Sequence, residues 1–210
     1  MTHDFDRTYW ERRWQETPAD DRNNLLLRPP HPYVIQETAH LATGSALECG
    51  CGDGAEAVWL ASNGWQVVAA DISSSAIERT AWRAQAMDVA NKVRAVEADL
   101  SQWQPDERFD LVTSHYAHPT MPQLDFYTRV AEWVKPGGTL LLVGHLHVHR
   151  DTGHDHHPPA SVSVTAASIT DRLGTENWQI ETAKEVERFV APHGRELTLH
   201  DVVVRATRLP

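Results

Sequence analysis

The sequence predicts one α/β domain with a seven-stranded, mostly parallel sheet, an antiparallel last strand and helices on both faces. Apolar, β-rich runs alternate with helical patterns between residues 46 and 144, and a glycine-rich loop directly follows the first run. Two strand-like runs then close the chain with no helix between them. With 210 residues and 41% hydrophobic content, the chain has the size and the core of a single domain. We therefore expect residues 1–210 to form one domain with an N-terminal helical arm, about residues 1–43.

The amino-acid composition limits the kinds of binding partner that we expect. The formal net charge is −10, from 19 basic and 29 acidic residues, and the sequence holds no basic run of the kind that binds nucleic acid. The first ten residues carry His3, Asp4, Asp6 and Arg7 and hold no apolar signal-peptide core, and no apolar run approaches the roughly 18 residues that span a membrane. We expect a cytoplasmic protein, a monomer or homodimer, that acts on a small molecule without nucleic acid or membrane. The two cysteines are too few for a disulfide framework.

The glycine-rich loop is the clearest ligand feature. Ala46 and Leu47 end an apolar strand, the segment Glu48-Cys49-Gly50-Cys51-Gly52-Asp53-Gly54 follows, and a helix is predicted over 55–63. Glycines can adopt positive φ and let a ligand approach the backbone, and the amides at the start of the following helix favour polar groups. The C-x-C pattern of Cys49 and Cys51 could indicate metal or redox chemistry, but inside this loop it favours two small packed residues.

The remaining elements follow in order. Helices are predicted over 8–16, 33–42, 73–88, 122–134 and 164–173, and further strands over 65–70, 93–98, 109–114, 139–144, 178–186 and 199–207. The segment Lys135-Pro136-Gly137-Gly138 is expected to end the helix before the fifth strand. Ligands of open α/β sheets bind at the carboxyl ends of the strands. Those ends carry Glu48, Asp71, Asp99, His115 and His145.

In this order the motifs resemble the class I S-adenosylmethionine-dependent methyltransferases, which have a Rossmann-like fold. That family places an acidic residue and G-x-G-x-G after the first strand, an acidic residue after the second, an Asp after the third, and a Lys-Pro-Gly-Gly turn before the fifth. The resemblance implies that Asp71 binds the ribose hydroxyls and Asp99 the adenine amine. Carboxylates suit both, because hydroxyls and amines are donors. The implied cofactor contacts are Glu48, Cys49, Gly50, Cys51, Gly52, Asp71, Ile72, Asp99, Leu100, His115, Trp10 and Trp14.

A nicotinamide dinucleotide is the main alternative ligand. Rossmann oxidoreductases carry G-x-G-x-x-G, whereas this loop reads G-x-G-x-G, and Asp99 has no role in such a site. Within the methyltransferases the chain resembles the small thiopurine and tellurite-resistance enzymes. Trp10 and Trp14 lie four residues apart on one helical face, as in the arm that covers the cofactor in those enzymes. Alternatively, the two indoles simply pack on the domain.

The acceptor site is less well defined by sequence. Ser114-His115-Tyr116-Ala117 follows the fourth strand in place of the Asn-Pro-Pro-Tyr of DNA and glutamine methyltransferases, which disfavours adenine-N6 methylation. His115 is a candidate general base, with Tyr116 lining the pocket and His145 as a second candidate, since imidazole accepts a proton near neutral pH. They could instead only contact the cofactor or shape the wall. The acceptor atom is left open among N, O and S.

A histidine-rich segment, residues 145–157, follows the fifth strand. On a continued strand His147 would share one face with His145 and His149, and a turn at Gly153 could bring back His154 and His156 to bind Zn²⁺. The alternative is a solvated substrate loop. Two classes of function follow from these patterns: a small-molecule methyltransferase that needs no metal, and a metal- or metalloid-handling methyltransferase or non-catalytic metal-binding protein.

Overall fold

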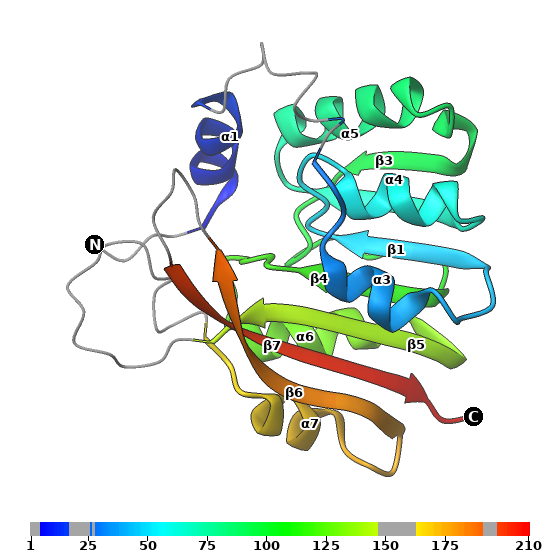
Figure 1. Cartoon of the computed structure of the whole chain (residues 1–210), viewed down its shortest axis with the longest axis vertical. Helices are drawn as coiled ribbons and strands as arrows, with labels where there is room; N and C mark the ends of the chain where they lie inside the picture. Colours follow the sequence, from blue (N-terminus) through cyan, green and yellow to red (C-terminus); the bar gives the residue numbers. More distant parts are fainter. Residues whose placement is uncertain (1–4, 17–25, 27, 147–162, 191–196) are drawn as a thin grey trace.

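The computed structural model describes residues 5–16, 26, 28–146, 163–190 and 197–210 (Figure 1). Seven strands form one sheet in the order β3-β2-β1-β4-β5-β7-β6. They are β1 (Ser45–Cys49), β2 (Gln66–Asp71), β3 (Val93–Glu97), β4 (Phe109–His115), β5 (Val134–His145), β6 (Trp178–Val190) and β7 (Leu197–Arg208). β1 to β5 pair in parallel, and β7 is antiparallel to both β5 and β6. The predicted sheet, with its antiparallel last strand, is confirmed.

Helices cover both faces of the sheet, as predicted. α3 (Pro32–Thr38), α4 (Ala55–Ser62) and α5 (Ser74–Ala86) lie on one face, and α6 (Gln123–Ala131) and α7 (Ala166–Leu173) lie on the other. The alternation of side chains along the central strands creates two cores: Ala46, Val67 and Ala69 face the first helix layer, and Leu47 and Val68 face the second. A 3₁₀ turn, η2 (Ala90–Lys92), leads into β3.

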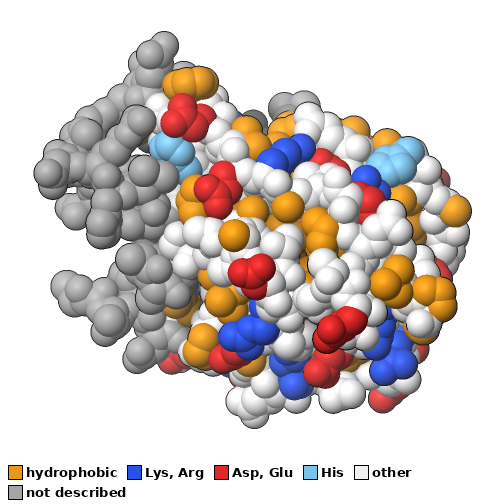
Figure 2. Space-filling view, turned by 90° about the horizontal axis from the view of Figure 1, so that it is seen from below, with side chains coloured by type: hydrophobic (Ala, Val, Ile, Leu, Met, Phe, Trp, Pro, Cys, Tyr) orange, Lys and Arg blue, Asp and Glu red, His pale blue; other side chains and the backbone are white. Residues whose placement is uncertain are grey.

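Local sequence explains most of the boundaries. Ser73 caps α5 by accepting a hydrogen bond from the Ala76 amide at 3.2 Å, and Thr165 caps α7. Pro32 occupies the first turn of α3, where its missing amide is not needed. Among the described residues, no helix is both long and apolar enough to cross a membrane. Figure 2 shows acidic and basic side chains interspersed over the described part of the face seen from below.

Several predicted boundaries were wrong. α3 ends at Thr38 rather than near residue 42, α6 ends at Ala131 rather than near residue 134, and Lys135–Gly138 lies inside β5. Val134 already pairs with Phe109, and the register shifts before Leu111 pairs with Thr139, so an irregularity in the ladder accommodates Pro136 and the two glycines. β6 and β7 are also longer than predicted.

The additional length of β6 and β7 projects beyond the end of β5. The last residue of β5, His145, pairs with Asp201 of β7, which pairs in turn with Val186 of β6. Residues 187–190 and 197–200 therefore continue past the carboxyl end of β5, and we call them the hairpin extension. In Figure 1 this part of β6 and β7 rises at the same edge of the sheet as α1 (Arg7–Glu16).

Candidate active site

The glycine loop lies at the carboxyl end of β1 and turns back against β2. The amides of Gly50 and Cys51 both donate to the Ala70 carbonyl, at 2.8 and 3.0 Å. Gly50 has φ 78° and Gly52 has φ 55°, a conformation that residues with a Cβ rarely adopt. Cys49 and Cys51 are buried, and burial raises the pKa of both thiols well above the ordinary value. They are packed residues of the loop, with little thiolate character.

Asp71 joins this loop to the end of β2. Its Oδ2 accepts a hydrogen bond from the Gly52 amide at 2.9 Å, and its Oδ1 accepts one from the Ser73 amide at 3.0 Å. The carboxyl is buried, and burial raises its pKa despite these amide donors. Each carboxylate oxygen has two lone pairs, so Asp71 can hold the loop and still accept from a ligand.

Asp99 and Leu100 follow β3 along the same edge. Asp99 accepts hydrogen bonds from the amide and hydroxyl of Ser101, at 3.0 and 2.7 Å, and from the Gln102 amide group at 3.1 Å. The carboxylate therefore stabilises the turn after β3. Leu100 is buried, and its carbonyl accepts a hydrogen bond from Arg129 of α6 at 2.9 Å.

The N-terminal helix α1 lies over the ends of β2 and β3. Arg7 forms an ion pair with Glu97, the last residue of β3, and donates to the Ile72 carbonyl at 2.8 Å. Glu11 accepts from the Ser73 hydroxyl at 2.7 Å and from the Ser75 hydroxyl, and these bonds lower its pKa to about 2. Two strand ends are thus covered by one short helix.

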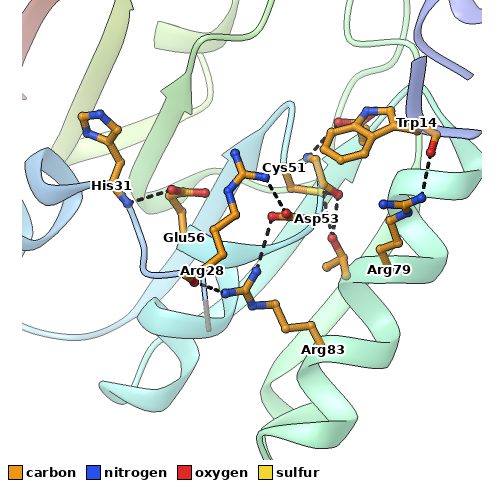
Figure 3. A network of polar contacts seen from close by, with 11 residues as sticks. Trp14, Arg28, His31, Cys51, Asp53, Glu56, Arg79 and Arg83 are labelled. Carbon is orange, nitrogen blue, oxygen red and sulfur yellow. Dashed lines mark hydrogen bonds and ion pairs between the residues drawn. The ribbon is translucent and has the colours of Figure 1, made fainter. Parts of the chain in front are cut away.

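Trp14 extends this cover to the glycine loop. A Cβ built on Gly52 would stand 2.8 Å from Cζ2 of Trp14, so the indole rests directly on the loop backbone. The Trp14 carbonyl accepts a hydrogen bond from Arg79 of α5 at 2.7 Å, and the Arg79 guanidinium lies 5.7 Å from the centre of the indole ring (Figure 3).

A second polar network joins the loop to the segment before α3 (Figure 3). Asp53 is buried and pairs with Arg28 at 2.7 Å and with Arg83 at 3.4 Å, and Arg83 also bonds the Arg28 carbonyl. Glu56 accepts a hydrogen bond from the His31 amide at 2.9 Å. These contacts fix the backbone that leads to His31, a side chain on the acceptor side described below.

Glu48 and His115 form a buried pair beneath the loop. Glu48 Oε1 lies 3.0 Å from His115 Nδ1, which also lies 3.2 Å from the Thr113 hydroxyl. Burial raises the pKa of Glu48 to about 7; burial opposes protonation of His115, but the Glu48 charge raises its pKa overall. Within the described residues, Glu48 Oε2 and His115 Nε2 are buried without hydrogen-bond partners.

Aromatic and imidazole rings line the edge beyond His115. Tyr116 packs 4.4 Å from His145 between ring centres, and His118 lies 5.6 Å from His145. Trp10 donates its indole N–H to the His118 carbonyl at 3.0 Å and stacks on the His118 ring. Burial lowers the pKa of His118, and lowers that of His145 to about 4, so both rings are neutral at pH 7.

Arg188 of the hairpin extension lies at the same wall, where it pairs with Asp201 of β7. Arg188 Nε donates to Asp201 Oδ2 at 2.8 Å, and Arg188 Nη2 donates to the Tyr116 hydroxyl at 3.3 Å. His31 also contacts that hydroxyl, with its Nε2 3.2 Å away. Asp201 is fully buried, while 27% of the Arg188 side chain is exposed.

Comparison with known proteins identifies the family of this site. Residues 46–138 match the model of the methyltransferase domain family. A probable thiol methyltransferase 2 of Arabidopsis thaliana is 32% identical over 164 residues, covering 74% of this chain and 68% of that protein. A thiocyanate methyltransferase 1 of Brassica oleracea is 31% identical over 163 residues, with the same two coverages.

The chain belongs to the class I S-adenosylmethionine-dependent methyltransferases. Solved structures share the methyltransferase fold. Magnesium protoporphyrin IX methyltransferase of Synechocystis PCC 6803 with bound S-adenosylhomocysteine has a TM-score of 0.68 at 16% identity, covering 98% of this chain and all of that chain. TehB of Haemophilus influenzae has a TM-score of 0.69 at 14% identity, covering 86% of this chain and 63% of that one.

The methyltransferase uses S-adenosylmethionine, and the residues at the ends of β1 and β2 suit this cofactor. Gly50 and Gly52 have positive φ, a conformation that glycine adopts readily in ligand-binding loops, and the Asp71 carboxylate offers lone pairs for ribose hydroxyls. Trp14 of α1 rests on the glycine loop and Trp10 contacts His118, while the roles of both tryptophans toward the cofactor stay predictions.

Several residues of the methyltransferase site were not anticipated from sequence. Arg7 and Glu11 share the helical spacing of Trp10 and Trp14, so the stripe itself could have indicated them. No local sequence pattern indicates Arg188, Asp201 or His31, because only the fold brings these residues to Tyr116. The metal candidates His147, His149, His154 and His156 lie outside the described residues; in the described part, no group of three or more metal-ligating side chains is present.

Proposed function

We propose that this methyltransferase transfers a methyl group to the sulfur of a small-molecule acceptor. This proposal rests mainly on the similarity of the chain to plant thiol and thiocyanate methyltransferases, at 32% and 31% identity. The acceptor side supports it, because aromatic rings and neutral imidazoles surround Tyr116 and His145. A polarisable sulfur packs well against such rings.

We assign the cofactor to the side of the edge covered by α1. Asp71 would hold the ribose hydroxyls, and the backbone from Gly50 to Gly52 would lie along the methionine part. Ile72 and Leu100, with Asp99, would border the adenine. Trp14 and Trp10 would cover the cofactor and keep water from the reacting atoms. The cofactor supplies a methyl group on a positively charged sulfur, which makes that carbon electrophilic.

The acceptor residues orient a nucleophile and, where needed, take its proton. In the transfer a sulfur lone pair forms the new S–C bond while the old S–C bond breaks and its electrons stay on the cofactor sulfur. A neutral thiol must also lose its proton, whereas an anionic sulfur has none to lose. We assign that proton to Nε2 of His115, whose Nδ1 bonds Glu48, as a carboxylate orients a catalytic histidine. His145, with its pKa lowered to about 4, is a weaker base and lines the wall.

We further propose one catalytic domain over residues 1–210 that works in the cytoplasm, as a monomer or homodimer, without nucleic acid. The net charge of −10 supports the last point. Glu48 would act behind the cofactor through its pair with His115. The buried Cys49 and Cys51 would support the cofactor loop by packing.

Isotope transfer tests the proposed function. The protein is incubated with S-adenosylmethionine labelled in the methyl group and a panel of thiocyanate, aliphatic and aromatic thiols, amines and phenols. Mass spectrometry should show labelled S-methyl products in a one-to-one ratio with S-adenosylhomocysteine. Labelled products from amines or phenols, with every sulfur acceptor unreacted, would contradict the proposal.

A further inference from the structure

The position of Arg188 beyond the end of β5 places a cation at the acceptor wall. Residue 188 lies in the hairpin extension, past the point where β7 pairs with His145. Its guanidinium contacts Asp201 through Nε and the Tyr116 hydroxyl through Nη2, at 2.8 and 3.3 Å. A guanidinium has five N–H donors, more than these two contacts use. The Arg188 side chain is 27% exposed, so part of it is accessible to solvent.

The neighbouring imidazoles cannot share this cationic role at neutral pH. Burial lowers the pKa of His31 and of His145 to about 4, and both values also respond to the charge of Arg188. The pKa of His118 is lowered by burial as well. Arg188 is therefore the positively charged group that the described residues present to Tyr116, with Asp201 holding it from the buried side.

The contacts of His31 determine which way the Tyr116 hydroxyl can donate. His31 caps α3 by accepting the Tyr33 amide at Nδ1, so the proton of the neutral ring is on Nε2, which then donates to the Tyr116 oxygen 3.2 Å away. Arg188 donates to the same oxygen. Burial, then the charge of Asp201 and a hydrogen bond to its carboxylate, raise the pKa of Tyr116, so the phenol keeps its proton and Asp201 accepts a hydrogen bond from it in the free protein.

Tyr116 is also held in a strained backbone conformation. Its φ of 54° is rare for a bulky residue, and its amide donates to the Val143 carbonyl at 2.9 Å. Such strain persists where the surroundings fix it, often at functional sites. The two donors and the protonated phenol therefore place one O–H group beside one guanidinium at the acceptor wall, where a bound anion would replace Asp201 as the acceptor of the phenol proton.

We propose that Arg188 and the hydroxyl of Tyr116 form an anion-binding subsite, which selects small, singly charged sulfur anions as acceptors. This inference rests on the proposed function and assigns its acceptor class. An anion held there reacts without a base, because its lone pair forms the S–C bond and no proton has to leave. Neutral thiols do not gain from the guanidinium and depend on His115 instead.

The test compares charged and neutral acceptors in the full-length protein. For Arg188→Met we expect the KM for thiocyanate to rise about tenfold or more, because hydrogen bonds to charged groups contribute about that much affinity. The KM for 2-mercaptoethanol at pH 7, where the thiol is protonated, should change less than about twofold on the same grounds. Tyr116→Phe should shift the thiocyanate KM in the same direction. An equal rise for both acceptors, or none, would overturn the proposal.

A binding measurement separates this inference from the proposed function. Azide is a linear anion of the same charge as thiocyanate, and it should bind the complex of the wild-type protein with S-adenosylhomocysteine in calorimetry but not that of Arg188→Met. If wild type methylates no sulfur acceptor yet binds azide in this way, the proposed function fails and the subsite stands. If wild type methylates thiols but binds no azide, the subsite fails alone.

Two further variants control for folding. Arg188→Met leaves the Asp201 carboxylate buried without its partner, so Arg188→Met combined with Asp201→Asn should recover stability but not azide binding. Arg205→Met is the matched control, because Arg205 pairs with the buried Glu37 at 3.2 Å on the same hairpin, away from Tyr116. Its azide affinity should equal that of wild type. Recovery of azide binding in the double variant, or loss in Arg205→Met, would identify the arginine effect as purely structural.

Discussion

The carboxyl edge of the sheet has a donor side, where we place the methyl donor, and an acceptor side around Tyr116. The two sides differ in which contacts hold their polar groups in place. On the donor side, Asp71 bonds backbone amides of Gly52 and Ser73, all of which belong to short segments after β1 and β2. On the acceptor side, Tyr116 meets His31 and Arg188, which are 85 and 72 residues away in the chain. The donor side is thus encoded by local motifs, whereas the acceptor side depends on how the sheet, α3 and the hairpin extension come together.

Removing the carboxylate of Asp71 should cause the largest loss of ligand affinity among these variants, and this loss should be confined to the donor side. Asp71→Ala removes two amide contacts and the acceptor for the ribose, so we expect the affinity for S-adenosylmethionine to fall about 100-fold. Calorimetric titration measures it. Asp110→Ala is the control, because Asp110 pairs with Lys135 at the opposite end of the strands. Equal losses in both variants would mean that Asp71 acts only through stability.

This comparison explains how much could be predicted from the sequence. The succession of strands and helices along the chain, the glycine loop and the position of Asp71 at the end of β2 were predictable, because apolar periodicity and turn chemistry are local. The end of α6 and the place of Lys135–Gly138 were wrong, since an irregular pairing of β4 with β5 absorbs residues that normally end a strand. Arg188 could not have been predicted as a site residue, because the sequence does not show that β6 extends past the end of β5.

His115→Gln should distinguish the two kinds of acceptor. The glutamine cannot take a proton, so turnover of 2-mercaptoethanol should fall about 100-fold, the usual contribution of a positioned base. Turnover of thiocyanate should change less than about threefold, because no proton leaves. Steady-state kcat for the two acceptors gives the result. A comparable loss for thiocyanate would show that His115 shapes the site rather than acting as a base.

The buried pair of Glu48 and His115 predicts a pH dependence of stability. The folded protein holds the Glu48 proton up to about pH 7, whereas the unfolded chain releases it near 4.5, so this group destabilises the fold as pH rises between those values. The raised pKa of His115 contributes stability that is likewise lost as pH rises through its folded value. Glu48→Gln should reduce the loss of unfolding free energy from pH 5 to 7 by on the order of 2 kcal/mol. Urea denaturation at both pH values measures it, and parallel curves for the two proteins would contradict the assignment.

Glu11→Gln should change ligand affinity least among these variants, because α1 covers both the donor side and the acceptor side but does not form the main binding surface of either. The amide still accepts hydrogen bonds but loses the charge that attracts the Ser73 and Ser75 hydroxyls, so cofactor affinity should fall about threefold. Gln15→Ala, a change on the same helix, provides the reference. A loss as large as that of Asp71→Ala would mean that the arm holds the cofactor itself.

The most direct test of this division is a crystal structure of the protein with S-adenosylhomocysteine and azide. We predict that the ribose lies against Asp71 and the methionine part along Gly50 and Gly52, with the azide in hydrogen-bond contact with Arg188 and the Tyr116 hydroxyl. An ordered azide elsewhere along the edge, with Arg188 still bonded only to Asp201 and Tyr116, would contradict the account of the acceptor side.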